Sequence, residues 1–459
     1  MPYLTRDIPL DGRQAVDLFA QVAGDDYSWL LETMGHPGPS LFGSRPRWVC
    51  RYKDGVSRVR EGSGWRETAG SPVTLVRERL RAVDAGGRLG DAPFAGGIVA
   101  LLGYDAAHLF ERLPCTTDDD LGLPDAVFLE TSYVVVVRPD EDRATIVVTA
   151  GAEASAELDR LVRMLSEAPV RPRPTVTREG PIDIPFTSTY SRDEYREMVL
   201  RVKEYIAAGD LIQANVSQRL CVAAPMGAFC LYEHLRSANP SPFAFYLDAG
   251  DFALASCSPE RLLELRGRRI QTRPIAGTRP RGRDEAADQV LRAELILNEK
   301  ERAEHIMLVD LERNDLGRVC DYGTVNVDEL MTIEAYSHVF HIVSNVSGRL
   351  REDKDALDAI AAAFPGGTIT GCPKIRCMEI IDEVERTRRG PYTGSVGYID
   401  YNGDMDLNII IRTFVVEDGQ AYIQVGGGIV ADSEPDAEFD ETMHKARALL
   451  RAAREATRP

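Results

Sequence analysis

Two pairs of glutamates with helical spacing are the first candidates for chemistry in this sequence. Glu301 and Glu304 lie three residues apart in an acid-rich stretch, and Glu438 and Glu441 repeat the spacing near the end of the chain, followed by Lys445. Residues three and four apart share one face of a helix. A single face of this kind is ordinarily a solvated salt-bridge surface. Two such faces, however, supply the carboxylates that Mg²⁺ takes together with waters and an anionic substrate.

Two glycine-rich turns could hold such a substrate. FPGGTITGCPK covers 364–374, before an expected helix, and QVGGGIVA covers 424–431, before the acidic helix. Backbone N–H groups at such turns bind anions, and glycines within a strand mark the close approach of a ligand. A phosphoryl-transfer enzyme has the same ingredients, but the GxxxxGK[ST] loop of nucleotide-binding proteins is missing from the sequence. The residues alone predict a Mg²⁺ enzyme with a small anionic substrate, without naming the reaction.

Composition restricts the partners. The 459 residues include 72 acidic and 54 basic side chains, a net charge of −18. Because nucleic-acid binding depends on cationic contacts to phosphates, we expect no nucleic-acid partner. The N-terminus lacks the apolar segment of a signal peptide and no apolar run is long enough to span a bilayer, so we expect a cytoplasmic protein without membrane contact. The eight scattered cysteines form no CxxC pair and are expected to be reduced thiols.

The elements that must position these residues mix strands and helices without a regular alternation. β-Branched runs bounded by turn residues predict strands over 127–140, 143–151, 210–224, 243–257, 392–401, 405–419 and 420–431. Apolar periodicity and capping residues predict helices over 154–168, 192–209, 289–315, 356–364, 372–389 and 434–456. This mixture predicts an α+β fold. A proline-rich segment near 170–186 divides an N-terminal region, 1–170, from the region 187–455 that carries the acidic pairs.

Long motifs of the second region resemble, in order, those of the chorismate-utilising enzymes. They are GDLIQANVSQR, SPERLLEL, TRPIAGTRPRG, ERAEHIMLVDLERNDLG, YSHVFHIVS, FPGGTITGCPK, RRGPYTGSVGY, IIIRT and QVGGGIVADSEPDAEFDET. In the first region, APFAGGIVALLGYD resembles the two aminating types of the family, anthranilate synthase component I and aminodeoxychorismate synthase component I. The resemblance implies large antiparallel β-sheets packed together, with helices outside.

The resemblance also implies a role for each candidate residue. Glu304 and Glu438 match the ligands of Mg²⁺, supported by Glu301 and Glu441. Glu260 matches the general acid that protonates the leaving C4 hydroxyl of chorismate, a role that requires a raised pKa. The positions that match residues around the substrate are Ala276, Gly277, Thr278, Thr368, Tyr392, Arg412, Gly426, Gly427 and Lys445, together with His341.

Gln213 separates amination from hydroxylation in this comparison. Members of the family that add water carry a lysine here as the base, whereas the aminating members carry glutamine. A neutral amide cannot deprotonate water but can orient ammonia, so the resemblance implies amination at C2 with loss of the C4 hydroxyl. Asn215 and the glycine turns favour the aminodeoxychorismate type, which serves 4-aminobenzoate and folate synthesis by a transaminase-type reaction. Ala276, in place of a lysine nucleophile, favours the alternative, the anthranilate type of tryptophan synthesis.

Two partners follow from the same comparison. The sequence has no GxCxGxQ glutaminase motif, so the nitrogen is expected as free ammonia or from a separate glutamine amidotransferase subunit. LLET and NPSPFAFYL resemble tryptophan-binding elements, in which core packing is the ordinary interpretation of the leucines. The candidate tryptophan residues are Leu31, Glu32, Thr33, Asn239, Pro240 and Ser241. A non-catalytic tryptophan-binding relative is a further alternative, against which the presence of Glu260 and Gln213 argues.

Overall fold

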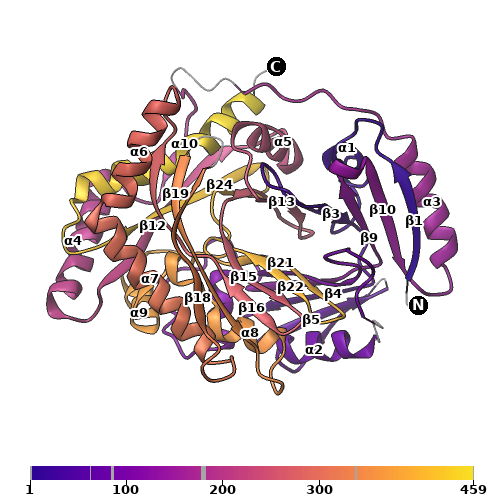
Figure 1. Cartoon of the computed structure of the whole chain (residues 1–459), viewed down its shortest axis with the longest axis horizontal. Helices are drawn as coiled ribbons and strands as arrows, with labels where there is room; N and C mark the ends of the chain where they lie inside the picture. The colour runs from indigo at the N-terminus through magenta and orange to yellow at the C-terminus, as the bar shows by residue number, and fades with distance from the viewer. Residues whose placement is uncertain (1–2, 63, 84–86, 177–181, 336–338, 458–459) are drawn as a thin grey trace.

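Two large sheets face each other in the computed structural model, and helices cover their outer sides (Figure 1). The structure describes residues 3–62, 64–83, 87–176, 182–335 and 339–457. Within these residues, neighbouring strands of both sheets run antiparallel to each other. The prediction of an α+β fold with packed antiparallel sheets is confirmed. Within the described residues, no helix is both long and apolar enough to cross a membrane.

The first sheet carries the glycine-rich strand. Its order is β1 (Tyr3–Pro9), β10 (Arg143–Thr149), β9 (Tyr133–Arg138), β3 (Ser40–Gly43), β2 (Trp29–Glu32), β13 (Phe243–Asp248), β14 (Ala253–Ser258), β23 (Thr413–Glu417), β24 (Gln420–Ile429), β12 (Gln213–Ala223) and β11 (Thr187–Ser188), and β20 (Gly371–Cys372) also pairs with β12.

The second sheet carries the histidine strand. Its order is β17 (Ile275–Pro280), β19 (Val339–Arg349), β16 (Arg269–Thr272), β15 (Arg261–Arg266), β22 (Met405–Asn408), β21 (Ser395–Asp400), β7 (Gly97–Leu102), β8 (Ala126–Glu130), β4 (Trp48–Lys53), β5 (Val56–Glu61) and β6 (Gly64–Thr68), and β18 (Asn326–Ala335) also pairs with β19.

Both sheets contain strands from each side of the proline-rich segment. In the first sheet β2 pairs with β13, and in the second β7 pairs with β21. Alternate side chains of these strands meet between the sheets in one apolar layer, which includes Val99, Leu101, Phe245 and Leu254. The predicted regions 1–170 and 187–455 therefore share their sheets and this core. Part of the segment between them, 177–181, lies outside the described residues.

The helices are α1 (Ala15–Phe19), α2 (Pro72–Ala82), α3 (Ala154–Ser166), α4 (Arg192–Ala208), α5 (Ala228–Ala238), α6 (Glu285–Leu297), α7 (Glu299–Gly317), α8 (Ala356–Ala363), α9 (Lys374–Val384) and α10 (Pro435–Ala456). Helix α4 begins after a Ser191 capping box and ends at left-handed Gly209, as predicted. The single helix predicted over 289–315 is wrong. Two helices meet at Asn298, whose side-chain oxygen accepts a hydrogen bond from Glu301 N and starts α7.

A second correction concerns the strand predicted over 405–419. The structure divides it into β22 in the second sheet and β23 in the first. The connection contains Arg412 with a φ of 53°, a backbone conformation that ends regular strand geometry. This crossing between the sheets brings Arg412 toward the buried residues described next.

Candidate active site

Glu260 follows β14 and is buried at 6% exposure. Its Oε1 atom has no hydrogen-bond partner among the described residues. Burial raises the pKa of this carboxyl to about 7, and the increase is opposed by the Thr368 hydroxyl, the Ile275 backbone and the positive charges of Arg412 and Lys445. A carboxyl that keeps its proton close to neutral pH can act as a general acid.

His341 lies in β19, opposite the backbone of Thr278 in β17. Its Nδ1 atom is 3.0 Å from the carbonyl oxygen of Gly277, and burial lowers its pKa to about 4. The ring is therefore neutral near pH 7, and because a carbonyl only accepts, Nδ1 carries the proton and Nε2 is left as an acceptor. Ala276 lies opposite Ile342 in the same ladder. The side chain of Thr278 lies outside the described part of the structure.

The two predicted acidic pairs face each other from α7 and α10. Burial raises the pKa of Glu304, the charge of Lys300 opposes the increase, and the charges of Glu301, Glu438 and Glu441 add to it, so the two acidic pairs interact electrostatically. Burial also raises the pKa of Glu438. A methyl group on Gly427 would lie 3.2 Å from Glu438 Oε2, so this carboxylate reaches the glycine-rich strand. The two predicted pairs thus influence each other electrostatically, and their role as a metal site stays a prediction.

These carboxylates fit a hard divalent cation by their chemistry. In the described residues, no three His, Cys, Asp or Glu side chains are already arranged as a metal centre. Mg²⁺ does not require three, because it usually takes one or two protein carboxylates and completes its shell with water and substrate. Glu301 is paired with Arg279 at 3.2 Å and Glu304 with the half-exposed Lys300 at 3.8 Å, yet the pKa values of Glu304 and Glu438 both remain raised by burial and by neighbouring carboxylates. A cation would compensate their negative charge.

Lys445 connects α10 to the glycine-rich strand. Its Nζ atom donates a hydrogen bond to the Gly426 carbonyl at 2.8 Å and pairs with Glu441 at 2.8 Å. The buried hydroxyl of Tyr392 lies on the same glycine, 2.8 Å from where a methyl group would stand. A cation and a phenol thus lie next to the glycine backbone of β24, an arrangement that suits a carboxylate ligand.

Gln213, at the start of β12, lies against the glycine-rich strand β24. It is 7% exposed, its Oε1 atom has no partner among the described residues, and its Nε2 atom is 2.6 Å from the position of a methyl group on Gly428. Three consecutive glycines are required because side chains lie directly on both faces of this stretch. The resemblance-based residue list did not include Gly428 or Asn215, whose side chain lies over Gly426. Each lies two residues from a predicted site residue of its strand, Gly428 from Gly426 and Asn215 from Gln213. This spacing was the sequence signal that could have identified them.

A buried acidic cluster behind the site was also missed. Burial and Asp315 raise the pKa of Glu312 to about 8, while Lys374 is bound to Asp315 at 2.6 Å. A methyl group on Gly367, in the short helix η3 (Gly367–Ile369) that carries Thr368, would lie 3.7 Å from Glu312 Oε1. The sequence ERND contained these acids, but only the fold places them beneath the FPGGT turn.

A cavity of about 530 Å³ lies between the sheets, lined by residues of both. Its wall includes Leu31, Glu32 and Thr33 from the candidate tryptophan residues. The adjoining segment 242–245 lines it, whereas Asn239, Pro240 and Ser241 are not among its lining residues; Asn239 Nδ2 is 3.4 Å from Ser241 Oγ instead.

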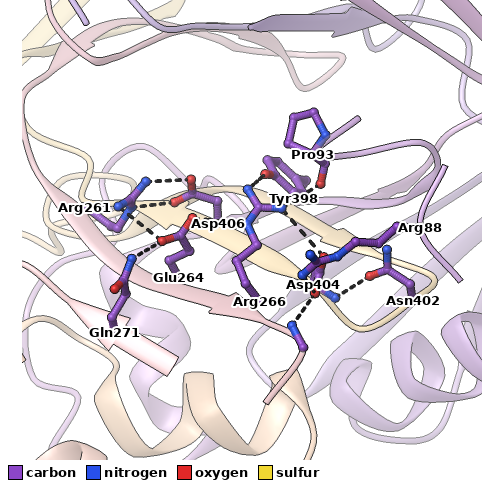
Figure 2. A network of polar contacts seen from close by, with 11 residues as sticks. Arg88, Pro93, Arg261, Glu264, Arg266, Gln271, Tyr398, Asn402, Asp404 and Asp406 are labelled. Atoms are coloured by element: carbon purple, nitrogen blue, oxygen red, sulfur yellow. Dashed lines mark hydrogen bonds and ion pairs between the residues drawn. The ribbon is translucent and has the colours of Figure 1, made fainter. Parts of the chain in front are cut away.

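One side of this cavity is a polar network (Figure 2). Arg261 pairs with Asp406 at 2.9 Å and Arg266 pairs with Glu264 at 3.1 Å, while Gln271 donates to Glu264. Glu32, on another wall, is held by Arg236 at 2.8 Å. The volume lies in the range of roughly 300–1,000 Å³ typical of small-molecule pockets.

Comparisons with known proteins agree with this arrangement. The family described as chorismate binding enzyme matches residues 41–451. Anthranilate synthase component 1 of Thermus thermophilus is 46% identical over 93% of this chain and 92% of its own length. Aminodeoxychorismate synthase component 1 of Bacillus subtilis is 42% identical over 92% and 91%. A crystal structure of anthranilate synthase component I from Streptococcus pneumoniae superimposes with a TM-score of 0.81 at 30% identity, covering 92% of this chain and 93% of that one.

The chain belongs to the chorismate-binding enzyme family, since the match covers far more than half of its length. Its fold of two packed antiparallel sheets is that of anthranilate synthase component I. Within the family it is a chorismate-utilising enzyme of the anthranilate synthase component I and aminodeoxychorismate synthase component I type. Relatives of both kinds match at similar identity, and the name "component 1" denotes one member of a multi-component enzyme in those proteins.

Proposed function

We propose that this protein aminates chorismate to 4-amino-4-deoxychorismate in the cytoplasm, in a Mg²⁺-dependent reaction on the way to 4-aminobenzoate and folate. The ammonia comes from a separate glutamine amidotransferase subunit or from solution. The observation that carries the amination is Gln213, a neutral, buried amide whose Oε1 atom has no hydrogen-bond partner among the described residues. An amide cannot serve as the base that activates water, but its oxygen can accept a hydrogen bond from ammonia.

The side chains divide the work in this proposal. Glu260 donates its proton to the C4 hydroxyl, so that the C4–O bond breaks and water leaves. The lone pair of ammonia forms the new C–N bond at C4, the carbon that loses its hydroxyl, because nitrogen at C2 would give the 2-amino isomer instead. The surplus proton on nitrogen restores the Glu260 carboxyl. Tyr392, Arg412 and Lys445 hold the substrate carboxylates, and neutral His341 orients the substrate by hydrogen bonding.

Glu304 and Glu438 would hold Mg²⁺, with Glu301 and Glu441 supporting them. When bound, the cation neutralises a substrate carboxylate and withdraws negative charge as the hydroxyl leaves. The burial of Glu304 and Glu438 keeps the electrostatic interaction stronger than it would be in water.

Anthranilate synthesis is the second candidate, and Ala276 is the residue that favours it. A methyl side chain cannot form the covalent adduct that a lysine would form at this position. Ammonia would then add directly at C2 as the C4 hydroxyl leaves, and loss of the pyruvyl group as pyruvate would give anthranilate. Asn215 and the FPGGT and GGG turns support the first candidate by resemblance.

The test is a product assay with purified protein, chorismate, Mg²⁺ and an ammonium salt above pH 8. Anthranilate fluorescence is followed directly, and a parallel reaction receives an aminodeoxychorismate lyase and is analysed for 4-aminobenzoate. Formation of 4-aminobenzoate only with the lyase is the expected result. Anthranilate without the lyase would replace the first candidate by the second, and consumption of chorismate without ammonia would contradict amination altogether.

We further propose that the cavity between the sheets binds tryptophan. Its support is the contribution of Leu31, Glu32 and Thr33 to a wall of mixed polar and apolar side chains. Titration calorimetry with L-tryptophan tests the proposal, and Phe243→Ala, in the wall, should weaken binding. Inhibition of turnover by tryptophan would indicate a regulatory site, and binding without inhibition a structural one. Absence of heat and of any thermal shift would leave ordinary core packing as the role of these residues.

A further inference from the structure

Polar side chains on one face of β12 differ in whether the protein satisfies their hydrogen bonds, and the change occurs at Asn215. Ser217 is saturated by protein groups: its hydroxyl donates to Glu385 at 2.9 Å and accepts from Gln424 Nε2 at 2.9 Å. Asn215 and Gln213 point to the same side, because side chains two apart in a strand share a face. Asn215 Oδ1 and Gln213 Oε1, however, have no hydrogen-bond partner among the described residues.

This lack of partners does not come from a loosely held strand. The backbone N–H of Asn215 donates to Thr370 O at 2.8 Å, and its carbonyl accepts from Arg389 Nη2 at 2.6 Å. Arg389 is itself fixed by buried Glu385 at 2.7 Å. An unmet acceptor at 8% exposure is energetically costly and uncommon in native proteins. A bound donor from outside the chain would remove this cost.

Glycines keep the space in front of the two amides open. A methyl group on Gly426 would lie 2.6 Å from Asn215 Oδ1, and one on Gly428 would lie 2.6 Å from Gln213 Nε2. Gly426 and Gly428 are two apart in β24 and face the same way, so the two amides lie next to each other along one side of that strand. Only glycine at both positions leaves them in place.

We propose that Asn215 is a second ammonia-binding residue, acting beside Gln213. The inference rests on the proposed amination of chorismate. Ammonia has three N–H donors and one lone pair, so it can donate to both amide oxygens, directly or through a water molecule, while its lone pair forms the C–N bond. Because neither amide carries charge, the pair accepts neutral ammonia, the reactive species, without selecting ammonium.

Steady-state kinetics of Asn215→Leu and Asn215→Asp test the assignment. Leucine keeps the shape and removes the acceptor, so KM for ammonium, at saturating chorismate and Mg²⁺ and fixed pH, should rise about tenfold, as expected for one lost hydrogen bond. KM for chorismate should stay unchanged. Aspartate keeps an acceptor oxygen and should restore most of the ammonium affinity. Ser217→Ala, on the same face but with protein partners, should leave the ammonium KM at its original value.

Three results would overturn the inference. An unchanged ammonium KM in folded Asn215→Leu would show that the amide does not contact ammonia. An increased chorismate KM with an unchanged ammonium KM would assign the amide to the substrate instead. A wild-type protein that turns over chorismate only with water would remove the proposed function, and the inference with it. If Asn215→Leu fails to fold, as judged by circular dichroism, Asn215→Ala provides the same comparison.

Discussion

The ammonium group of Lys445 donates a hydrogen bond to the carbonyl oxygen of Gly426 over 2.8 Å, which ties the last helix to the glycine-rich strand. The same group pairs with Glu441, four residues earlier on α10, at 2.8 Å. Both side chains are about half exposed, at 43% and 53%, so their pairing contributes little to stability. The position of this cation at the glycine backbone is better explained by substrate binding.

Lys445→Met should therefore weaken chorismate binding more than it weakens the fold. We expect KM for chorismate to rise roughly 10- to 100-fold, the loss of one or two charge-assisted hydrogen bonds, with a change in unfolding free energy below about 1 kcal/mol. Steady-state kinetics and urea denaturation measure the two effects. Equal KM values with a large loss of stability would indicate that Lys445 only fastens α10.

Removal of the acid at Glu260 should abolish turnover while stabilising the protein at neutral pH. Glu260→Gln should lower kcat by about 10²–10⁴, the usual contribution of a general acid. In the wild type, kcat/KM for chorismate should fall as pH rises through about 7, measured at a constant concentration of free ammonia.

The stability effect of Glu260 has a definite sign. The folded state holds this proton up to about pH 7, whereas the unfolded state releases it near 4.5, so wild-type stability decreases as pH rises between these values. Glu260→Gln lacks this decrease, and its advantage should grow to about 3 kcal/mol by pH 7. Urea denaturation at pH 4.5 and pH 7.5 measures it. A constant difference would show that the Glu260 pKa is not raised.

A methyl group on Gly428 should displace Gln213. Gly428→Ala places its Cβ atom 2.6 Å from Gln213 Nε2, so we expect a large fall in ammonia-dependent turnover and a loss of about 1–3 kcal/mol through overpacking. Gly317→Ala is the matched control, because no atom lies within 4 Å of its Cβ position and φ is not positive. That variant should keep its activity. Full activity of Gly428→Ala would place the amide outside the reaction.

Metal removal should stop the reaction without unfolding the chain. Chelation by EDTA should abolish turnover, and added Mg²⁺ should restore it with saturation. Glu304→Gln and Glu438→Gln should each raise the Mg²⁺ concentration needed for half-maximal activity at least about tenfold, because each removes one of the few carboxylate ligands that Mg²⁺ takes. Glu299→Gln, an exposed carboxylate on the same helix as Glu304, should behave like the wild type. Turnover that persists in EDTA would contradict the metal assignment.

The buried pair of Arg389 and Glu385 should matter far more to stability than an exposed one. Their side chains are 1% and 3% exposed, so Arg389→Met leaves a buried carboxylate without its partner and should cost about 3–5 kcal/mol. Arg201→Met breaks the exposed pair with Glu383 and should cost less than about 1 kcal/mol. Guanidinium denaturation compares the two. Similar losses would mean that Glu385 finds another partner when Arg389 is removed.

Local sequence patterns determined much of the secondary structure and the set of side chains available for chemistry. Ser191 and Gly209 bound α4 because capping depends on neighbouring residues only, and the spacing of Glu438, Glu441 and Lys445 fixed their common helical face. The break at Asn298 was missed because helical periodicity continues on both sides of it. The Asn298 side chain accepts a backbone hydrogen bond at the start of the second helix, and this cap competes with a continuous helix.

Tertiary structure alone decided which of these residues meet. Gln213 and Gly428 are separated by more than 200 positions in the sequence, and only the pairing of β12 with β24 brings the amide onto the glycine. The pKa of Glu260 near 7 has no sequence signature, because burial by several distant segments produces it. The sequence by itself determined the carboxylates, amides and glycines available for chemistry. Long-range strand pairing and burial decided their distances and protonation, because these depend on contacts between parts of the chain that local patterns do not specify.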